Sequence, residues 1–138
     1  MATDTKLDLL VLLSAIGSAE GYFTTGTVPN SSNNPGDLRF AGQEGSKPSI
    51  HGGPIPFAQF DCPERGIVAG LRQICAMTQR GLSLRQLIYA WAPPTGPDGG
   101  NPSELYLTET IRRISQASGV TIDPERKLWE YLPISHIP

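Results

Sequence analysis

The 138-residue sequence has few of the residues that build metal centres and disulfide frameworks. It contains only two cysteines and two histidines. His51 has no cysteine or histidine close to it in the sequence, and His136 lies in the C-terminal tail, so we expect no metal site and no cofactor. Cys62 and Cys75 fall thirteen residues apart on one predicted helix, a separation of about 20 Å along the axis. A disulfide needs Cα atoms within about 7 Å, so we expect two separate thiols.

Excess charge and long apolar runs are also missing. The net charge is −2 with both signs scattered along the chain, so there is no basic stripe of the kind that binds nucleic acid. The apolar run at 7–16 is too short to span a bilayer. Asp4 and Asp8 flank or enter this run and Lys6 is its only basic neighbour, which is not a convincing signal peptide. The location of the protein stays open.

Glycine and proline are abundant instead, with 15 and 13 residues. They gather at 26–56 and 93–102, where we expect two sizeable loops. The length favours one domain, residues 1–138, with a single core, and we expect a monomer. Apolar periodicity predicts helices over 5–20, 61–80, 83–90, 101–118 and 123–132. Residues 38–40 and 56–60 are candidates for a small β-hairpin, so the predicted fold class is mainly α (α+β).

Residues that favour helix ends support these boundaries. Thr5 with Asp8, and Ser83 with Gln86, resemble capping boxes. Asp61 is expected to cap the second helix, which then opens with a proline. Asn101 is expected to cap the fourth. Glycines at 21, 81 and 119 are suited to the left-handed closing position.

Glu20 stands at an unusual place in the first helix. Its spacing from Leu9, Leu13 and Ile16 puts it on their apolar stripe, and apolar residues cover most of the remaining circumference, as in a buried helix. The negative end of the helix dipole and burial both disfavour the charged form of a carboxylate there. Such a carboxyl is suited to donating a proton near neutral pH. The alternative is a surface glutamate at a frayed helix end.

The segments after Glu20 carry a recognisable order of motifs. They read NNPGDLRF at 33–40, FAQF at 57–60, WAP at 91–93, N-x-S-x-x-Y at 101–106 and SGVTID at 118–123. In this order, the set resembles the lysozyme-like proteins of phage lysis and virion modules and of bacterial cell-wall enzymes, over roughly residues 15–131. The resemblance implies a lysozyme-like helical domain with a long loop and small β-hairpin after the first helix.

The resemblance also implies roles for particular residues. Glu20 matches the catalytic acid, and Tyr106 matches a tyrosine whose hydroxyl lies near that acid, although it is equally consistent with a flanking core residue. Trp91 and Tyr22 have faces that suit stacking on sugars, or belong to the core or cleft wall. Arg39 orients a carboxylate or pins the loop. The loop residues expected to line a substrate cleft are Asn33, Asn34, Gly36, Asp37, Leu38 and Arg39.

Asp37 departs from the family pattern, which usually has asparagine there. It is either a simple turn substitution, which we favour, or a second carboxylate that positions water.

The function implied by the resemblance is cleavage of peptidoglycan between N-acetylmuramic acid and N-acetylglucosamine, with glycan strands at the bacterial cell wall as the partner. Without a strong second carboxylate, we favour the lytic transglycosylase route, in which the 6-hydroxyl of the substrate attacks and Glu20 acts first as acid and then as base. Hydrolysis by a water held at Asp37 is the close variant. The alternative from another class is a non-catalytic glycan-binding or virion structural module of the same fold.

Overall fold

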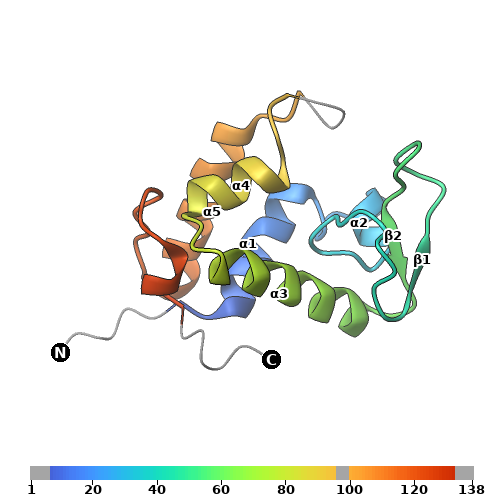
Figure 1. The fold of residues 1–138 in the computed structure, drawn as a ribbon, viewed down its shortest axis with the longest axis horizontal. Helices are drawn as coiled ribbons and strands as arrows, with labels where there is room; N and C mark the ends of the chain where they lie inside the picture. The colour runs from blue at the N-terminus through green and yellow to red at the C-terminus, as the bar shows by residue number, and fades with distance from the viewer. Residues whose placement is uncertain (1–6, 96–99, 133–138) are drawn as a thin grey trace.

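The structure is a computed structural model that describes residues 7–95 and 100–132. It is mainly helical with one small antiparallel sheet, an α+β fold as expected. Figure 1 places the sheet and its loops at one end of the molecule and α4 and α5 at the other. The elements are α1 (Leu9–Glu20), α2 (Val28–Ser31), β1 (Ser46–Pro48), β2 (Ala58–Phe60), α3 (Pro63–Gln79), α4 (Leu84–Trp91), α5 (Ser103–Ser118) and the 3-10 helix η1 (Leu128–Glu130).

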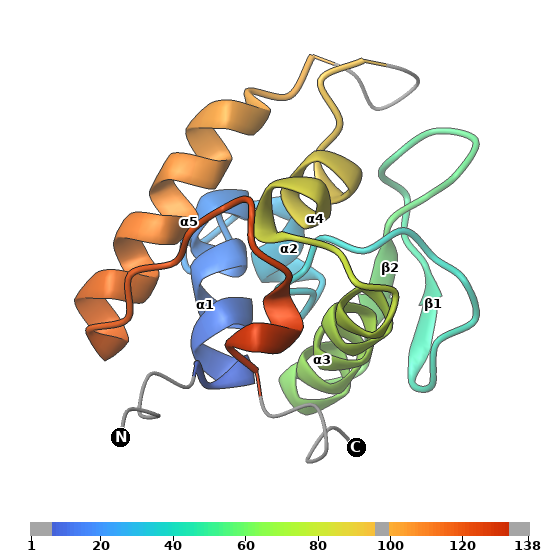
Figure 2. The ribbon, with the colours of Figure 1, turned by 60° about the vertical axis from the view of Figure 1, so that its left-hand side comes forward.

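The first helix forms the centre of the core, as its apolar circumference predicts. Leu12, Leu13 and Ile16 are buried, and Figure 2 shows α1 between α5 on one side and α3 on the other. Ile114 of α5 and Ile74 of α3 are fully buried in the same cluster. Because α1 is held on two sides, its C-terminal end is fixed relative to both neighbours.

Several helix ends follow the local sequence signals. Gly21 closes α1 in the left-handed conformation with φ +88°, and its N–H donates to the carbonyls at the end of the helix. Ser83 and Gln86 form the expected capping box at the start of α4. Gly119 closes α5 at φ +75°.

Other predicted ends are wrong. The first helix begins only at Leu9, where the carboxylate of Asp8 accepts the N–H of Leu10, and Thr5 lies outside the described residues. Cys62 rather than Asp61 precedes α3, and the N–H of Asp61 donates to the carbonyl of Gly45 in the preceding loop. The expected final helix shortens to the three residues of η1.

The start of α5 is also displaced from the prediction. Pro102 precedes the helix in place of Asn101. The Asn101 side chain donates to the carbonyl of Pro93 at 2.9 Å, so its amide holds the preceding loop.

The predicted hairpin has a different partner. The strand Ala58–Phe60 pairs with Ser46–Pro48, in the register Ser46 opposite Phe60. The predicted segment 38–40 joins only through an isolated bridge between Arg39 and Phe57. A three-residue strand that ends in proline, inside a glycine-rich loop, has no alternating apolar pattern to reveal it.

The two cysteines are free, as expected, with Cys62 just before α3 and Cys75 buried within it. Within the described ranges, the helices are too short or too polar to cross a bilayer.

Candidate active site

Glu20 lies between the core and an open cavity. It is the last residue of α1 and is half-buried. On one side it borders apolar groups that include Ile16, Ala19 and Ile88. On its other side it lines a cavity of about 480 Å³. The carboxyl group therefore lies at the boundary between the core and a cavity of the size that ligand sites have.

The cavity is built from six parts of the chain. The end of α1 meets the 37–43 loop, and Phe57 lies beside them. The face of α3, the end of α4 with the residues that follow it, and Asn101 before α5 complete it. Its lining residues are Glu20, Asp37, Leu38, Arg39, Ala41, Gln43, Phe57, Gln73, Met77, Ala90, Trp91, Ala92, Pro93 and Asn101.

The carboxyl group of Asp37 forms a hydrogen bond with that of Glu20. Its backbone lies in a tight turn, with φ +49° and its N–H donated to the carbonyl of Asn34 at 3.0 Å. The favoured interpretation, a simple turn substitution, therefore describes the backbone alone. The side chain is a second carboxylate of the site, because it lines the same cavity as Glu20 and interacts with it.

The environment of Glu20 keeps it protonated. Burial raises its pKa most, and the negative charge of Asp37 and the hydrogen bond to Asp37 raise it further, to about 8. Two carboxyl groups in contact cannot both ionise readily, so one proton is shared between them. At neutral pH, Glu20 is thus a carboxylic acid that faces an open cavity.

Asn34 and Asn33 build the loop rather than line the cavity. Asn34 is fully buried. Its amide donates to the carbonyls of Leu38 and Ala58 at 3.0 and 2.9 Å, and its oxygen accepts the N–H of Leu38 at 2.9 Å. The Asn33 amide donates to the carbonyl of Phe60 at 3.0 Å. Neither residue lines the 480 Å³ cavity; their amides tie the loop to β2 and so help to hold Asp37, and contact with a ligand stays a prediction.

Trp91 fastens the same loop to α4. Its indole Nε1 donates to the carbonyl of Gly36 at 2.6 Å. A Cβ at Gly36 would lie 2.8 Å from the Trp91 ring, so the position admits only glycine at this approach. The ring also lines the cavity, so Trp91 both positions the neighbour of Asp37 and presents an aromatic surface.

Arg39 holds the loop at 50–57 against the cavity. Its Nη1 donates to the carbonyls of Gly52 and Ile55 at 3.0 and 2.6 Å. The guanidinium stacks on the Phe57 ring, 3.8 Å from its centroid. These contacts agree with the expectation that Arg39 pins the loop.

The two tyrosines expected at the site, Tyr106 and Tyr22, differ in their surroundings. Tyr106, on α5, borders the same apolar space as Glu20. Its pKa is raised by burial first and then by the charges of Glu20 and Asp37, which places it near the carboxyl pair. Tyr22 instead packs edge-on against Phe23, and the 480 Å³ cavity does not include it.

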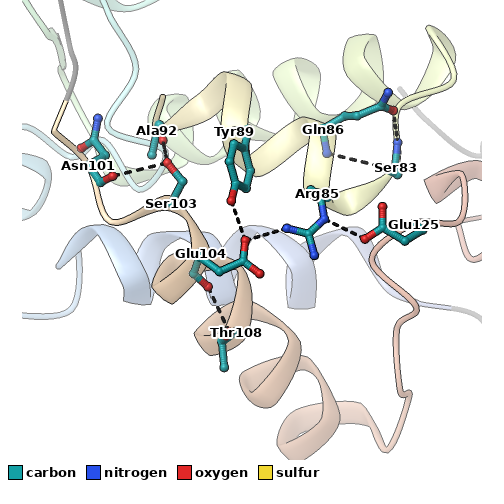
Figure 3. Close-up of polar contacts among 10 residues, drawn as sticks. All are labelled: Ser83, Arg85, Gln86, Tyr89, Ala92, Asn101, Ser103, Glu104, Thr108 and Glu125. Atoms are coloured by element: carbon teal, nitrogen blue, oxygen red, sulfur yellow. Dashed lines mark hydrogen bonds and ion pairs between the residues drawn. The ribbon is translucent and has the colours of Figure 1, made fainter. Parts of the chain in front are cut away.

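The WAP and N-x-S-x-x-Y motifs are joined to each other. Figure 3 shows the Ser103 hydroxyl donating to the carbonyl of Ala92. On the outer side, Arg85 of α4 bonds Glu104 at 2.6 Å and Glu125 at 2.7 Å, and Tyr89 also donates to Glu104. These contacts fix α4 against α5, and so fix Trp91 relative to Tyr106.

Gln73 and Met77 are cavity residues that sequence reasoning missed. They are four positions apart on α3 and therefore share a face. That spacing was readable in the sequence, but not which loop the face meets.

Among residues 7–95 and 100–132, no three His, Cys, Asp or Glu side chains gather closely enough to hold a metal ion. Comparisons with protein-family models, curated proteins and solved structures found no match for this chain.

Proposed function

We propose that the protein cleaves the β-1,4 bond between N-acetylmuramic acid and N-acetylglucosamine in peptidoglycan, with Glu20 as general acid. The observation that carries this proposal is the carboxyl pair at the edge of the cavity. Burial and Asp37 together hold Glu20 in its protonated form near neutral pH, which is the form that a glycosidic oxygen requires. The order of sequence motifs and the aromatic wall at Trp91 support a glycan as the ligand.

In the proposed reaction, the Glu20 proton passes to the glycosidic oxygen as the bond to the anomeric carbon breaks. Glu20 is then a carboxylate facing the carboxylate of Asp37. The repulsion between the two charges makes Glu20 a strong base, because regaining a proton relieves it. It takes that proton from the hydroxyl that attacks the anomeric carbon, and the site returns to its starting state.

The contact between the Glu20 and Asp37 carboxyl groups bears on whether a water or the 6-hydroxyl of the substrate attacks the anomeric carbon. Hydrolytic glycosidases separate their carboxyls by about 5–5.5 Å or about 6.5–9.5 Å, which leaves room for a sugar ring or a water. Asp37 is instead engaged with Glu20 itself, through its charge and a hydrogen bond. Attack by the substrate's own 6-hydroxyl needs no second, distant carboxylate and gains from proximity, so we propose the lytic transglycosylase route.

Digestion of purified sacculi tests this proposal. We expect the wild-type protein to release anhydro-muropeptides, one water lighter than hydrolytic products in mass spectrometry. Glu20→Gln should fold and release none, whereas the matched change Glu64→Gln, at an exposed position on α3, should behave as wild type.

Two results would count against the proposal. Equal clearing by Glu20→Gln would exclude Glu20 as the acid. Binding of sacculi by the wild-type protein without cleavage would identify a non-catalytic glycan-binding module instead.

A further inference from the structure

A second cavity, of about 400 Å³, adjoins the 480 Å³ cavity that Glu20 lines, which we call the cleft. The two share three lining residues, Leu38, Gln43 and Gln73. A ligand that occupies the cleft can therefore extend into the second cavity without leaving the protein surface.

The floor of the second cavity is one stripe of α3. Arg65, Val68, Ala69, Arg72 and Gln73 line it, and their spacing of three and four residues places them on one face of the helix. Val68 is 44% exposed although it is a large apolar residue. We call this surface the α3 groove.

The two arginines of the α3 groove are in different electrostatic situations. Arg65 is neutralised by Glu44, with Nη1 2.6 Å from Oε2. Arg72 is exposed, and across residues 7–95 and 100–132 it has no ion pair or hydrogen bond from its side chain. The groove thus combines an apolar floor with one uncompensated guanidinium.

We propose that the α3 groove binds the acidic peptide stem that branches from N-acetylmuramic acid, with Arg72 paired to a stem carboxylate. This inference rests on the proposed function, because the glycan in the cleft is what brings the stem to the groove. A guanidinium binds a carboxylate through two parallel hydrogen bonds, and the methyl groups of alanine suit the surface of Val68 and Ala69.

The chemistry of the groove favours a peptide over a further sugar. Sugar rings are bound by stacking on aromatic faces, and the described lining of the second cavity contains no aromatic residue. The cleft does contain them, at Phe57 and Trp91. The division between an aromatic cleft and a cationic, aliphatic groove matches the division of the substrate into glycan and peptide.

Binding measurements in the Glu20→Gln protein test this inference without cleavage. The ligands are a soluble disaccharide that carries an acidic peptide stem, the same molecule with its stem carboxylates amidated, and the disaccharide without peptide. Arg72→Gln should weaken binding of the acidic ligand about two- to fivefold, within the range expected of an exposed ion pair. Binding of the other two ligands should be unchanged, and Arg72→Lys should restore part of the loss.

Arg80→Gln is the matched control, because it removes the same charge from an exposed position at the end of α3, outside both cavities. Equal affinity of Arg72→Gln for the acidic ligand, an equal loss for all three ligands, or no binding of the acidic ligand at all would each overturn the inference. Cleavage of sacculi reports separately on the proposed function, so the two proposals fail by different results.

Discussion

Glu20→Gln should make the protein more stable at pH 8 than the wild type, although it removes the proposed catalytic acid. The side-chain amide keeps the shape of the protonated carboxyl and still donates to Asp37. It has no proton to lose, so it never places a second negative charge beside Asp37. The variant therefore isolates the energetic consequence of holding an acid in this position.

The size of the effect follows from the pKa of Glu20 in the two states. The pKa is about 8 in the folded protein and 4.5 in an ordinary setting. Below pH 4.5, both states are protonated and the substitution changes little. As the pH rises from 4.5 to 8, the unfolded wild-type chain releases the proton while the folded protein retains it, so wild-type stability falls.

That interval of 3.5 pH units corresponds to about 5 kcal/mol, at about 1.4 kcal/mol per pH unit. Glu20 is half-buried at a cavity edge, where water and side chains relax around a charge, so we expect a gain of about 2–3 kcal/mol at pH 8.

Urea denaturation of both proteins at pH 4, 6 and 8 measures this difference. The gain in the free energy of unfolding should be near zero at pH 4, intermediate at pH 6 and largest at pH 8. Glu64→Gln, on the exposed first turn of α3, should change it by well under about 1 kcal/mol at every pH. A gain that is independent of pH, or a Glu20→Gln protein that is less stable at pH 8, would refute the idea that folding holds Glu20 protonated.

Two further substitutions test the surroundings of the pair. Asp37→Asn should move the alkaline limit of the pH–activity profile downward from about pH 8, because the Asp37 charge and hydrogen bond both raise the pKa of Glu20; an unmoved limit would contradict this. Gly66→Ala should destabilise the protein strongly in thermal denaturation, because its Cβ would lie 1.8 Å from the carbonyl oxygen of Asn33. Gly70→Ala is the control and should cost less, because the nearest atoms to its Cβ belong to the Leu13 side chain, which can change rotamer, rather than to the backbone.

Local signals were sufficient to predict much of the helical frame. The apolar circumference of α1, the glycine that ends it and the Ser83–Gln86 capping box all depend on residues within a few positions of each other, and the structure confirms them. The predicted helix starts at Asp61 and Asn101 failed although each residue is a good cap by itself. The Asn101 side chain is bound to the carbonyl of Pro93, whereas the Asp61 N–H is bound to Gly45 and the helix begins after Cys62.

The candidate site depended more on contacts that are distant in the sequence. The position of Glu20 at the end of an apolar stripe could be predicted from its own helix. The placement of Asp37 could not, because the loop that carries Asp37 is held by hydrogen bonds to Ala58 and Trp91, which are distant in the sequence. The α3 groove was invisible for the same reason. Its stripe is regular, but only the fold shows that a loop, rather than another helix, faces it.

The carboxyl pair is unfavourable for the fold, and that is the strongest reason to connect it with chemistry. A glutamine at position 20 would satisfy the same hydrogen bond without a titrating group, and an asparagine at 37 would remove the opposing charge.

The chain instead holds Asp37 at φ +49°, a conformation that is uncommon for residues other than glycine. It reinforces this loop with the buried Asn34 amide and the Trp91 indole. Strain and unfavourable charge kept in place by several independent contacts are typical of functional sites. A structural role does not require an acid whose pKa is held near 8, whereas proton donation at neutral pH does.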